Sequence, residues 1–268
     1  MPRTRRDLFA PILANPAAIG PLLLLGRLFT TVLFIYYGLN VLTKAHPDNP
    51  ILYAALLIQV VGVVMVALGY RTRLAAFVMA AYCIVTTIAF RARPAYLEFF
   101  MQHYMKDLAV AAGFMFMYVS GPGPMSLDAY LDRDDARPLS DDSVAVGLVM
   151  LVGRLLEILI FAFAGQNKIF HNDSMRAYMV KHNPHVPPSL LTLAIVTQVV
   201  APTLVLLGYK TRWAAVALAG FCIIATVLFH TEFSNPTELI NFLLDFGIAG
   251  GCGFLFAFGP GRFSIDAR

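Results

Sequence analysis

Long apolar runs separated by short polar segments dominate the chain. Eight runs are each close to the roughly 17–25 residues that a helix needs to cross the hydrocarbon core of a bilayer. They cover residues 19–42, 51–70, 74–90, 105–120, 144–166, 189–208, 213–230 and 238–258. No stretch alternates apolar and polar residues with a period of two, which favours helices over strands. The pattern predicts an all-α membrane protein with eight transmembrane helices.

Composition supports this prediction. Of the 268 residues, 59% are hydrophobic and 13% are charged, and the mean hydropathy is +0.70. A soluble domain carries about 25% charged residues, roughly twice this share. The N-terminal segment is basic and lacks an apolar stretch that ends in a small-residue cleavage site, so it is expected to be a cytoplasmic tail.

The second half of the sequence repeats the first. Seven of nine positions are identical between LGYRTRLAA (68–76) and LGYKTRWAA (207–215). Two further pairs align: GRLFTTVLFIYYGLN with GRLLEILIFAFAGQN, and GPGPMSLD with GPGRFSID. The offset grows from 127 (153 − 26) to 139 (207 − 68), because the second copy carries about twelve extra residues within His171–Pro188.

This duplication predicts the domain organisation. We expect a tail at 1–18, a first four-helix repeat at 19–128, an acidic cytoplasmic linker at 129–143 and a second four-helix repeat at 144–268. Four helices return the chain to its starting side, so the two repeats should run parallel. With the N-terminus inside, 13 Lys and Arg residues fall on the cytoplasmic side and 7 on the other. This bias predicts that both termini are cytoplasmic.

The repeated motifs carry a resemblance to a known family. Each copy has Gly-Arg in its first helix, Gly-x-Asn at the outer end of that helix, Leu-Gly-Tyr-x-Thr-Arg-x-Ala-Ala after the second, one Asp early in the fourth, and a closing Gly-Pro-Gly-x-x-Ser-[Leu/Ile]-Asp. In this combination the chain resembles the DoxX family of membrane proteins over nearly its whole length. Members of that family are typically single four-helix units, so the resemblance implies a fused pair.

Ionisable and amide side chains inside apolar helices are costly and mark candidate functional positions. The candidates are Arg27, Arg154, Glu157, Asp107, Asp245, Gln59, Gln198, Asn40, Asn167 and Lys168. Glu157 lies three residues after Arg154, so the two can pair on one helix face. An Arg–Asp pair within each repeat is a second hypothesis. Two interpretations stay open: these groups hold the helices in register, or they line an internal cavity that binds a polar head group or moves protons.

Metal and redox chemistry find little support in the sequence. His171, His182 and His185 do not form a complete ligand set with an Asp, Glu or Cys, so no metal ligands are assigned. The three cysteines lie in apolar segments without CxxC spacing and are expected to be packing residues. No cofactor motif is present, and a quinone or a lipid is the expected ligand.

The leading functional hypothesis is a non-catalytic subunit of a bacterial-type inner membrane that binds a lipophilic ligand and associates with a redox partner. The resemblance implies two alternatives: a thiosulfate:quinone oxidoreductase-like subunit, which would be an enzyme, or an assembly chaperone. A small-solute or lipid transporter is the third alternative. The partners expected are membrane lipids, a protein of a redox complex and further copies of the chain. Nucleic acid is not expected, because the isoelectric point near 9.0 reflects Lys and Arg that flank membrane helices.

Overall fold

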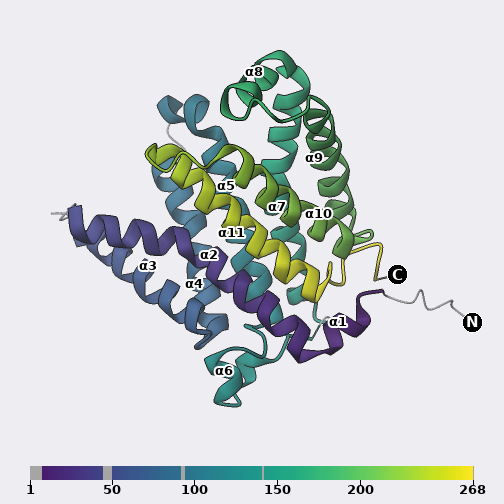
Figure 1. The fold of residues 1–268 in the computed structure, drawn as a ribbon. Helices are drawn as coiled ribbons and strands as arrows, with labels where there is room; N and C mark the ends of the chain where they lie inside the picture. Colours follow the sequence, from purple (N-terminus) through teal and green to yellow (C-terminus); the bar gives the residue numbers. More distant parts are fainter. Residues whose placement is uncertain (1–7, 45–49, 92–93, 141, 268) are drawn as a thin grey trace, which may run out of the picture.

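The computed structural model describes residues 8–44, 50–91, 94–140 and 142–267, and every regular element within these ranges is a helix (Figure 1). The long helices are α2 (Pro16–Lys44), α3 (Pro50–Leu68), α4 (Thr72–Thr86), α5 (Pro94–Ser120), α7 (Val144–Phe170), α9 (Ser189–Leu207), α10 (Thr211–Phe229) and α11 (Pro236–Phe258). The short elements are α1 (Ala10–Ala14), the π-helix η1 (Thr87–Arg91), α6 (Leu127–Tyr130), the 3₁₀-helix η2 (Asp134–Ala136) and α8 (Asn172–His182). Residues 1–7 of the predicted tail lie outside the described residues.

Six helices among the described residues are long and apolar enough to cross a membrane. They cover Pro16–Asn40, Thr72–Ala89, Val144–Phe170, Ser189–Leu207, Thr211–Phe229 and Pro236–Phe258. The predicted span at 51–70 corresponds to a shorter apolar helix, Tyr53–Leu68. The predicted span at 105–120 lies in α5, where Lys106 and Asp107 lower the hydropathy. The structure therefore supports a polytopic helical membrane protein with six of the eight expected spans.

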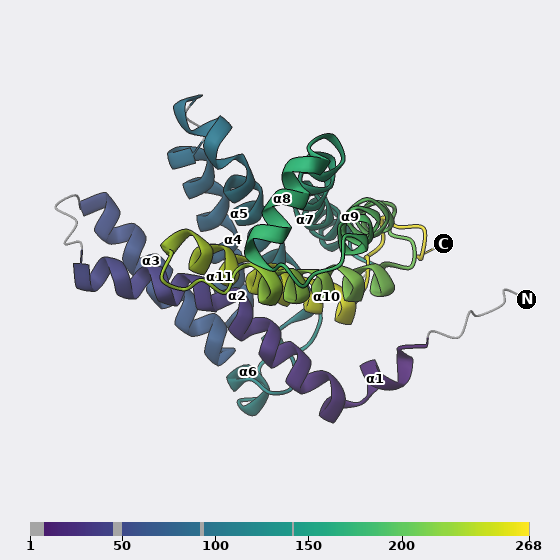
Figure 2. The ribbon, with the colours of Figure 1, turned by 45° about the horizontal axis from the view of Figure 1, so that its top comes forward.

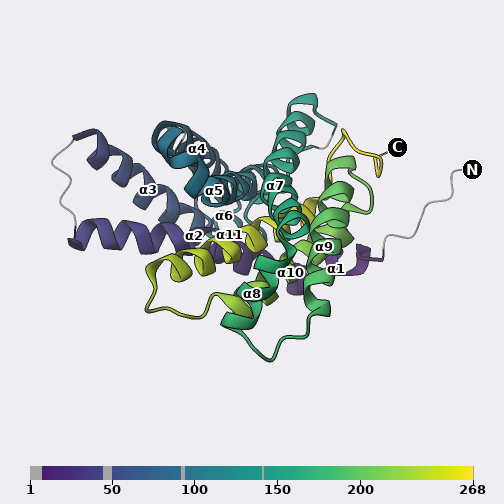
Figure 3. The same cartoon turned by 90° about the horizontal axis from the view of Figure 1, so that it is seen from above.

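Helices from the two halves of the chain pack against each other. The most extensive contact of α2 is with α11, and that of α7 is with α5, while α5 and α11 also pack together (Figures 2 and 3). By contrast, α2 makes little contact with α5, the last long helix of its own half. Each half is thus an open row of four long helices, and the two rows close on each other in a single body.

Two glycine contacts allow α2 to pack closely on α11 and α7 to pack closely on α5. A Cβ at Gly26 of α2 would lie 2.9 Å from the ring of Phe254 on α11. A Cβ at Gly153 of α7 would lie 2.6 Å from the ring of Phe116 on α5. Both distances are shorter than any real Cβ contact, so each helix pair approaches this closely only because one partner has no side chain at that position.

The contact between α5 and α11 depends on a third pair of glycines. A Cβ at Gly251 would lie 2.8 Å from the Cα of Gly113, and a Cβ at Gly113 would lie 3.0 Å from the Cα of Gly251. Small residues at helix crossings are the usual route to close backbone packing in membranes. This crossing joins the two halves at the centre of the molecule.

The first repeated turn is closed by a buried aspartate. Gly69 has a φ of +68° and Arg71 a φ of 43°, which reverse the chain between α3 and α4. The Asp128 carboxylate accepts hydrogen bonds from the backbone N–H of Arg71 (2.8 Å), the backbone N–H of Thr72 (2.9 Å) and the Thr72 hydroxyl (2.7 Å). Arg133 also contacts this carboxylate, with Nε 3.3 Å from Oδ1. Asp128 is fully buried and caps the N-terminus of α4.

The second repeated turn is closed in the same way. The Asp266 carboxylate accepts hydrogen bonds from the N–H groups of Lys210 and Thr211, both at 3.0 Å, and from the Thr211 hydroxyl at 3.3 Å. Asp266 is exposed, whereas Asp128 is buried. The final Asp of each closing motif is therefore the N-terminal cap of the third long helix in its half.

The glycine crossing gives a first prediction. Gly251→Ala should lower the free energy of unfolding of the purified protein by about 1–3 kcal/mol, because the added methyl group collides with backbone that cannot move aside. Gly253→Ala, on the same helix, is the matched control: its Cβ would meet no atom within 4 Å. Thermal unfolding in detergent, followed through the fluorescence of Trp213, compares them. If the two variants were equally stable, the close approach of α5 and α11 at Gly113 and Gly251 would be contradicted.

The caps give a second prediction. Asp128→Asn should destabilise the protein by about 1–3 kcal/mol, because the amide places N–H groups against buried backbone donors. Asp266→Asn should cost less, because water reaches that exposed turn. The same unfolding measurement tests this difference, and a larger loss for the Asp266 variant would show that the burial of the two caps has been misjudged.

Candidate functional site

The two buried arginines contact backbone carbonyls rather than acidic side chains. Arg27 donates from Nη1 to the carbonyl of Ala67 (3.3 Å) and from Nη2 to that of Met125. Arg154 donates in the same manner to the carbonyls of Val205 (3.3 Å) and Phe263. These carbonyls lie near the C-terminal ends of α3 and α9 and in the closing motifs, where a positive charge is favourable. Both guanidinium groups therefore hold the repeated turns in place.

Glu157 does not form the predicted pair with Arg154. Its Oε1 instead accepts a hydrogen bond from the Cys252 thiol at 3.1 Å, and its Oε2 has no hydrogen-bond partner among the described residues. Glu157 is fully buried between α7 and α11. The pairing fails because the terminal nitrogens of Arg154 point towards the turn.

The amide side chains of Gln59 and Asn40 contact groups of the first half, to which both residues belong. Gln59 donates from Nε2 to the carbonyl of Phe34 (2.8 Å), and its Oε1 accepts from the hydroxyl of Tyr82 (2.7 Å). Asn40 donates to the carbonyl of Tyr36 on its own helix at 2.9 Å. Asp107 is half-buried on α5. Both the nitrogen and the oxygen of the Gln59 amide therefore have a hydrogen-bond partner.

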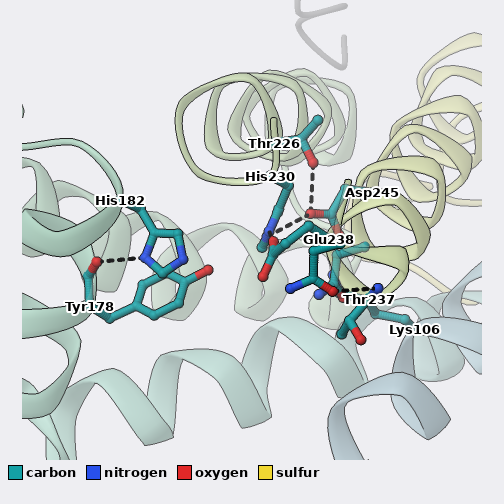
Figure 4. Close-up of polar contacts among 10 residues, drawn as sticks. Lys106, Tyr178, His182, Thr226, His230, Thr237, Glu238 and Asp245 are labelled. Carbon is teal, nitrogen blue, oxygen red and sulfur yellow. Dashed lines mark hydrogen bonds and ion pairs between the residues drawn. The ribbon is translucent and has the colours of Figure 1, made fainter. Parts of the chain in front are cut away.

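Asp245 belongs to a polar cluster that joins the two halves (Figure 4). Its Oδ1 lies 2.7 Å from Nζ of Lys106 on α5, and its Oδ2 accepts a hydrogen bond from the Thr226 hydroxyl at 2.9 Å. Lys106 also donates to Oδ1 of Asn241 at 3.2 Å. The predicted partner of the Asp residues was an arginine within the same half, but the cation is a lysine of the other half.

His230 and Glu238 extend this cluster. Nδ1 of His230 lies 2.5 Å from Oε2 of Glu238, and its Nε2 lies 3.8 Å from Oδ2 of Asp245 (Figure 4). All three side chains are at least four-fifths buried. Both carboxylates of the cluster therefore already have donors or cations beside them.

A cavity of about 680 Å³ lies next to the cluster in the second half of the chain. Helices α7, α9, α10 and α11 form its walls, together with parts of α5 and α8. Its apolar lining includes Ile160, Phe161, Leu191, Val216, Phe221 and Leu228. Its polar lining includes Lys106, Lys168, Gln198, His230, Asn241 and Asp245. Apolar walls with a few polar groups are the usual composition of a small-molecule site, and this volume is within the usual range.

Helix α8, which the insertion after α7 supplies, contributes one side of this cavity. Met175, Tyr178 and Met179 of α8 line it. Burial, together with the negative charges of Glu238 and Asp245, raises the pKa of Tyr178 to about 12. Its hydroxyl therefore stays neutral at physiological pH and is available as a hydrogen-bond donor. His182 stacks on the Tyr178 ring, with the centroids 4.0 Å apart.

Gln198 and Gln59 occupy similar surroundings with one difference. The rings of Phe34 and Tyr82 are 6.5 Å apart at 72°, and those of Phe161 and Phe221 are 6.4 Å apart at 70°. Tyr82 bonds to Gln59, whereas Phe221 has no hydroxyl to offer Gln198.

This difference leaves an unpaired polar group in the cavity wall. Oε1 of Gln198 has no hydrogen-bond partner among the described residues, although the residue is only 4% exposed. A buried polar atom without a partner costs about 1–3 kcal/mol. Gln198 lines the cavity, so a donor group on a ligand can supply the missing hydrogen bond once the amide turns towards the cavity space.

Three of the ten sequence candidates join Gln198 in the cavity wall: Asp245, Asn167 and Lys168. Arg27, Arg154, Glu157, Asp107, Gln59 and Asn40 are not part of its lining. Sequence reasoning missed Lys106, His230 and Glu238 as members of the site. Lys106 stands beside Asp107 in the sequence, and only the packing of α5 against α11 shows which of the two faces the cavity.

Comparisons with known proteins identify relatives among inner-membrane proteins. The family model DoxX matches residues 149–231, and the SURF4 family model matches residues 14–133. The inner membrane protein YqjF of Escherichia coli is 33% identical over 117 residues, which are 44% of this chain and 88% of YqjF. The inner membrane protein YphA of the same organism is 30% identical over 144 residues, which are 52% of this chain and 96% of YphA. No solved structure matches.

The ion pair between the halves gives a third prediction. Lys106→Gln should destabilise the protein by about 3–5 kcal/mol, because it leaves the buried Asp245 carboxylate without its cation. Adding Asp245→Asn should restore most of the loss, because neither charge is then buried alone. Lys181→Gln, on the exposed surface of α8, is the control and should have no effect. Thermal unfolding is compared for the wild-type protein, Lys106→Gln, the double variant and Lys181→Gln. A double variant no more stable than Lys106→Gln would contradict the ion pair.

Proposed function

The chain belongs to the DoxX family of inner-membrane proteins, and we propose that it is a non-catalytic subunit that binds a lipophilic ligand, a quinone or a lipid. The site is the cavity of the second half. The observation that carries this proposal is the combination of apolar walls with the unpartnered Oε1 of Gln198. The walls favour a hydrocarbon body, and Gln198 favours a polar group at a defined position on it.

The surface around the cavity supports access from the bilayer. Leu193, Val216 and Ile224 line the cavity, and their side chains are also 59%, 47% and 56% exposed. Exposed apolar side chains on membrane helices face lipid tails. A hydrophobic molecule can therefore enter from the lipid phase without crossing water, as a quinone or a lipid would.

The domain organisation is part of the same proposal. We propose two fused four-helix repeats, because the contacts of Gly26 with Phe254 and of Gly153 with Phe116 connect matching positions of the aligned halves. The relatives support this division, since each aligns over most of its own length with about half of this chain. The repeats exchange their first helices, so neither half is a closed bundle.

The orientation is proposed from charge. Helices α1 and α6 lie at the end of the molecule opposite α8 (Figure 1). The α1 and α6 end carries the larger share of Lys and Arg, so it is placed in the cytoplasm together with both termini. The cavity cluster then lies towards the outer side of the membrane.

The other functions stay predictions. The family resemblance is the source of three of these predictions: association with a redox partner, a thiosulfate:quinone oxidoreductase-like activity and an assembly-chaperone role. Transport comes from the parallel repeats and the charges inside the helices. The geometry favours ligand binding over these functions because it supplies a cavity with an unpaired polar atom.

A single hydroxyl group tests the proposal. Phe221→Tyr should place a hydroxyl at Oε1 of Gln198, as Tyr82 does at Gln59, and should weaken the binding of neutral lipophilic probes about tenfold, which is about 1.4 kcal/mol. A decyl-tailed benzoquinol and oleyl alcohol, each with a hydroxyl that can donate to Oε1, serve as probes in a displacement assay on purified protein.

Tyr82→Phe is the matched control, because it removes the same hydroxyl in the first half. It should lower stability slightly and leave probe binding unchanged. Failure of the wild-type protein to bind either probe would overturn the proposal. The same conclusion would follow if Tyr82→Phe weakened binding while Phe221→Tyr did not.

A further inference from the structure

We propose that the ligand is an anionic amphiphile, with a carboxylate or phosphate head group on a hydrocarbon tail, and that Lys168 binds the anion. This inference rests on the proposed function and specifies the chemistry of the ligand. It follows from the way in which the charges around the cavity are paired.

Both acidic side chains of the cavity are already satisfied. Asp245 lies 2.7 Å from Lys106 and accepts a hydrogen bond from Thr226, while Glu238 lies 2.5 Å from His230. Each carboxylate therefore has a donor or cation of its own. Neither is left over to pair with a second lysine.

Lys168 is a cavity-lining cation without such a partner. Its ammonium has no hydrogen bond or ion pair with any residue that the structure describes. Its charge interacts with two others: the like charge of Lys106 repels it, and Asp245 attracts it. Because Asp245 already forms an ion pair with Lys106, a ligand anion would give the Lys168 ammonium the partner that it lacks.

Lys168 and Gln198 both line the cavity, from the adjacent helices α7 and α9. Gly165, one helical turn earlier on α7, packs directly on α9: a Cβ there would lie 3.3 Å from the Cβ of Gln198. Residues three apart lie on one face of a helix, so Lys168 projects from the face that meets Gln198. The terminal amide of a glutamine can present either its oxygen or its NH₂ group at one position. Gln198 can therefore donate to an anion held by Lys168.

A charge–charge contact here should be strong. The cavity walls are mostly apolar, and a low local dielectric strengthens attraction between opposite charges. Hydrogen bonds between an ammonium and a carboxylate or phosphate are roughly twice as strong as neutral ones. The same walls, from Leu191 to Leu228, accommodate the tail. The aligned position of the first half carries Val41 in place of Lys168, so one anion site per chain is expected.

The test compares three probes that share one tail: oleate, monooleoyl phosphatidate and oleyl alcohol. Wild-type protein in detergent should bind both anions about tenfold more tightly than the alcohol. Lys168→Gln should remove this preference and leave the binding of the alcohol unchanged, whereas Lys168→Arg should retain it. Preference for oleate alone would identify a fatty acid, and preference for the phosphatidate alone a phospholipid.

Arg176→Gln is the control, because this cation lies on the exposed face of α8 outside the cavity lining. Thermal unfolding verifies that each variant is folded, and Lys168→Met replaces Lys168→Gln if the latter does not fold. Equal wild-type affinity for the anions and the alcohol would overturn this inference and leave the proposed function intact. An equal loss for all three probes in Lys168→Gln would also overturn it. Failure of all three to bind wild-type protein would overturn the proposed function as well.

Discussion

The ion pair between Lys106 and Asp245 is the interaction on which the rest of the site depends. It connects α5 of the first half to α11 of the second and forms part of the cavity wall. Buried charges need partners because no water solvates them. Because Asp245 is paired with Lys106, Lys168 is left without an ion pair among the described residues. The same pair that joins the two halves thus sets the electrostatic character of the cavity.

The two halves share a set of side-chain contacts but differ in whether the glutamine has all its hydrogen-bond partners and in whether a cavity lies beside it. Both place a glutamine beside a pair of aromatic rings, and both tie an arginine to the turn that an aspartate caps. In the first half the Tyr82 hydroxyl completes the hydrogen bonds of Gln59. In the second half Phe221 leaves Gln198 unsatisfied, and the insertion that forms α8 encloses the space beside it. The same arrangement of a glutamine and two aromatic rings can therefore serve packing in the first half and ligand binding in the second.

Much of the fold could be predicted from the sequence, because apolar length and repeated motifs are local signals. The long helices lie close to the expected ranges except α5, which begins at Pro94, eleven residues before the predicted start at 105. The sequence could not show that α2 packs on α11, since this depends on glycines that meet only in three dimensions. For the same reason the hypothesis of an Arg–Asp pair within each repeat is wrong for Asp245, whose cation, Lys106, comes from the other half. The candidate site was predicted only in part. Four of the candidates line the cavity: Gln198, Lys168, Asn167 and Asp245. Arg27 and Arg154 instead bind backbone carbonyls, because a charge inside a membrane helix can serve packing as well as ligand binding.

An experimental density map of the protein in a lipid nanodisc tests the central claim most directly. The account predicts elongated density between α7, α9 and α10, with its polar end within hydrogen-bonding distance of Gln198 and Lys168, and no matching density in the first half. A map in which protein side chains fill this space, with Oε1 of Gln198 bonded to one of them, would contradict it.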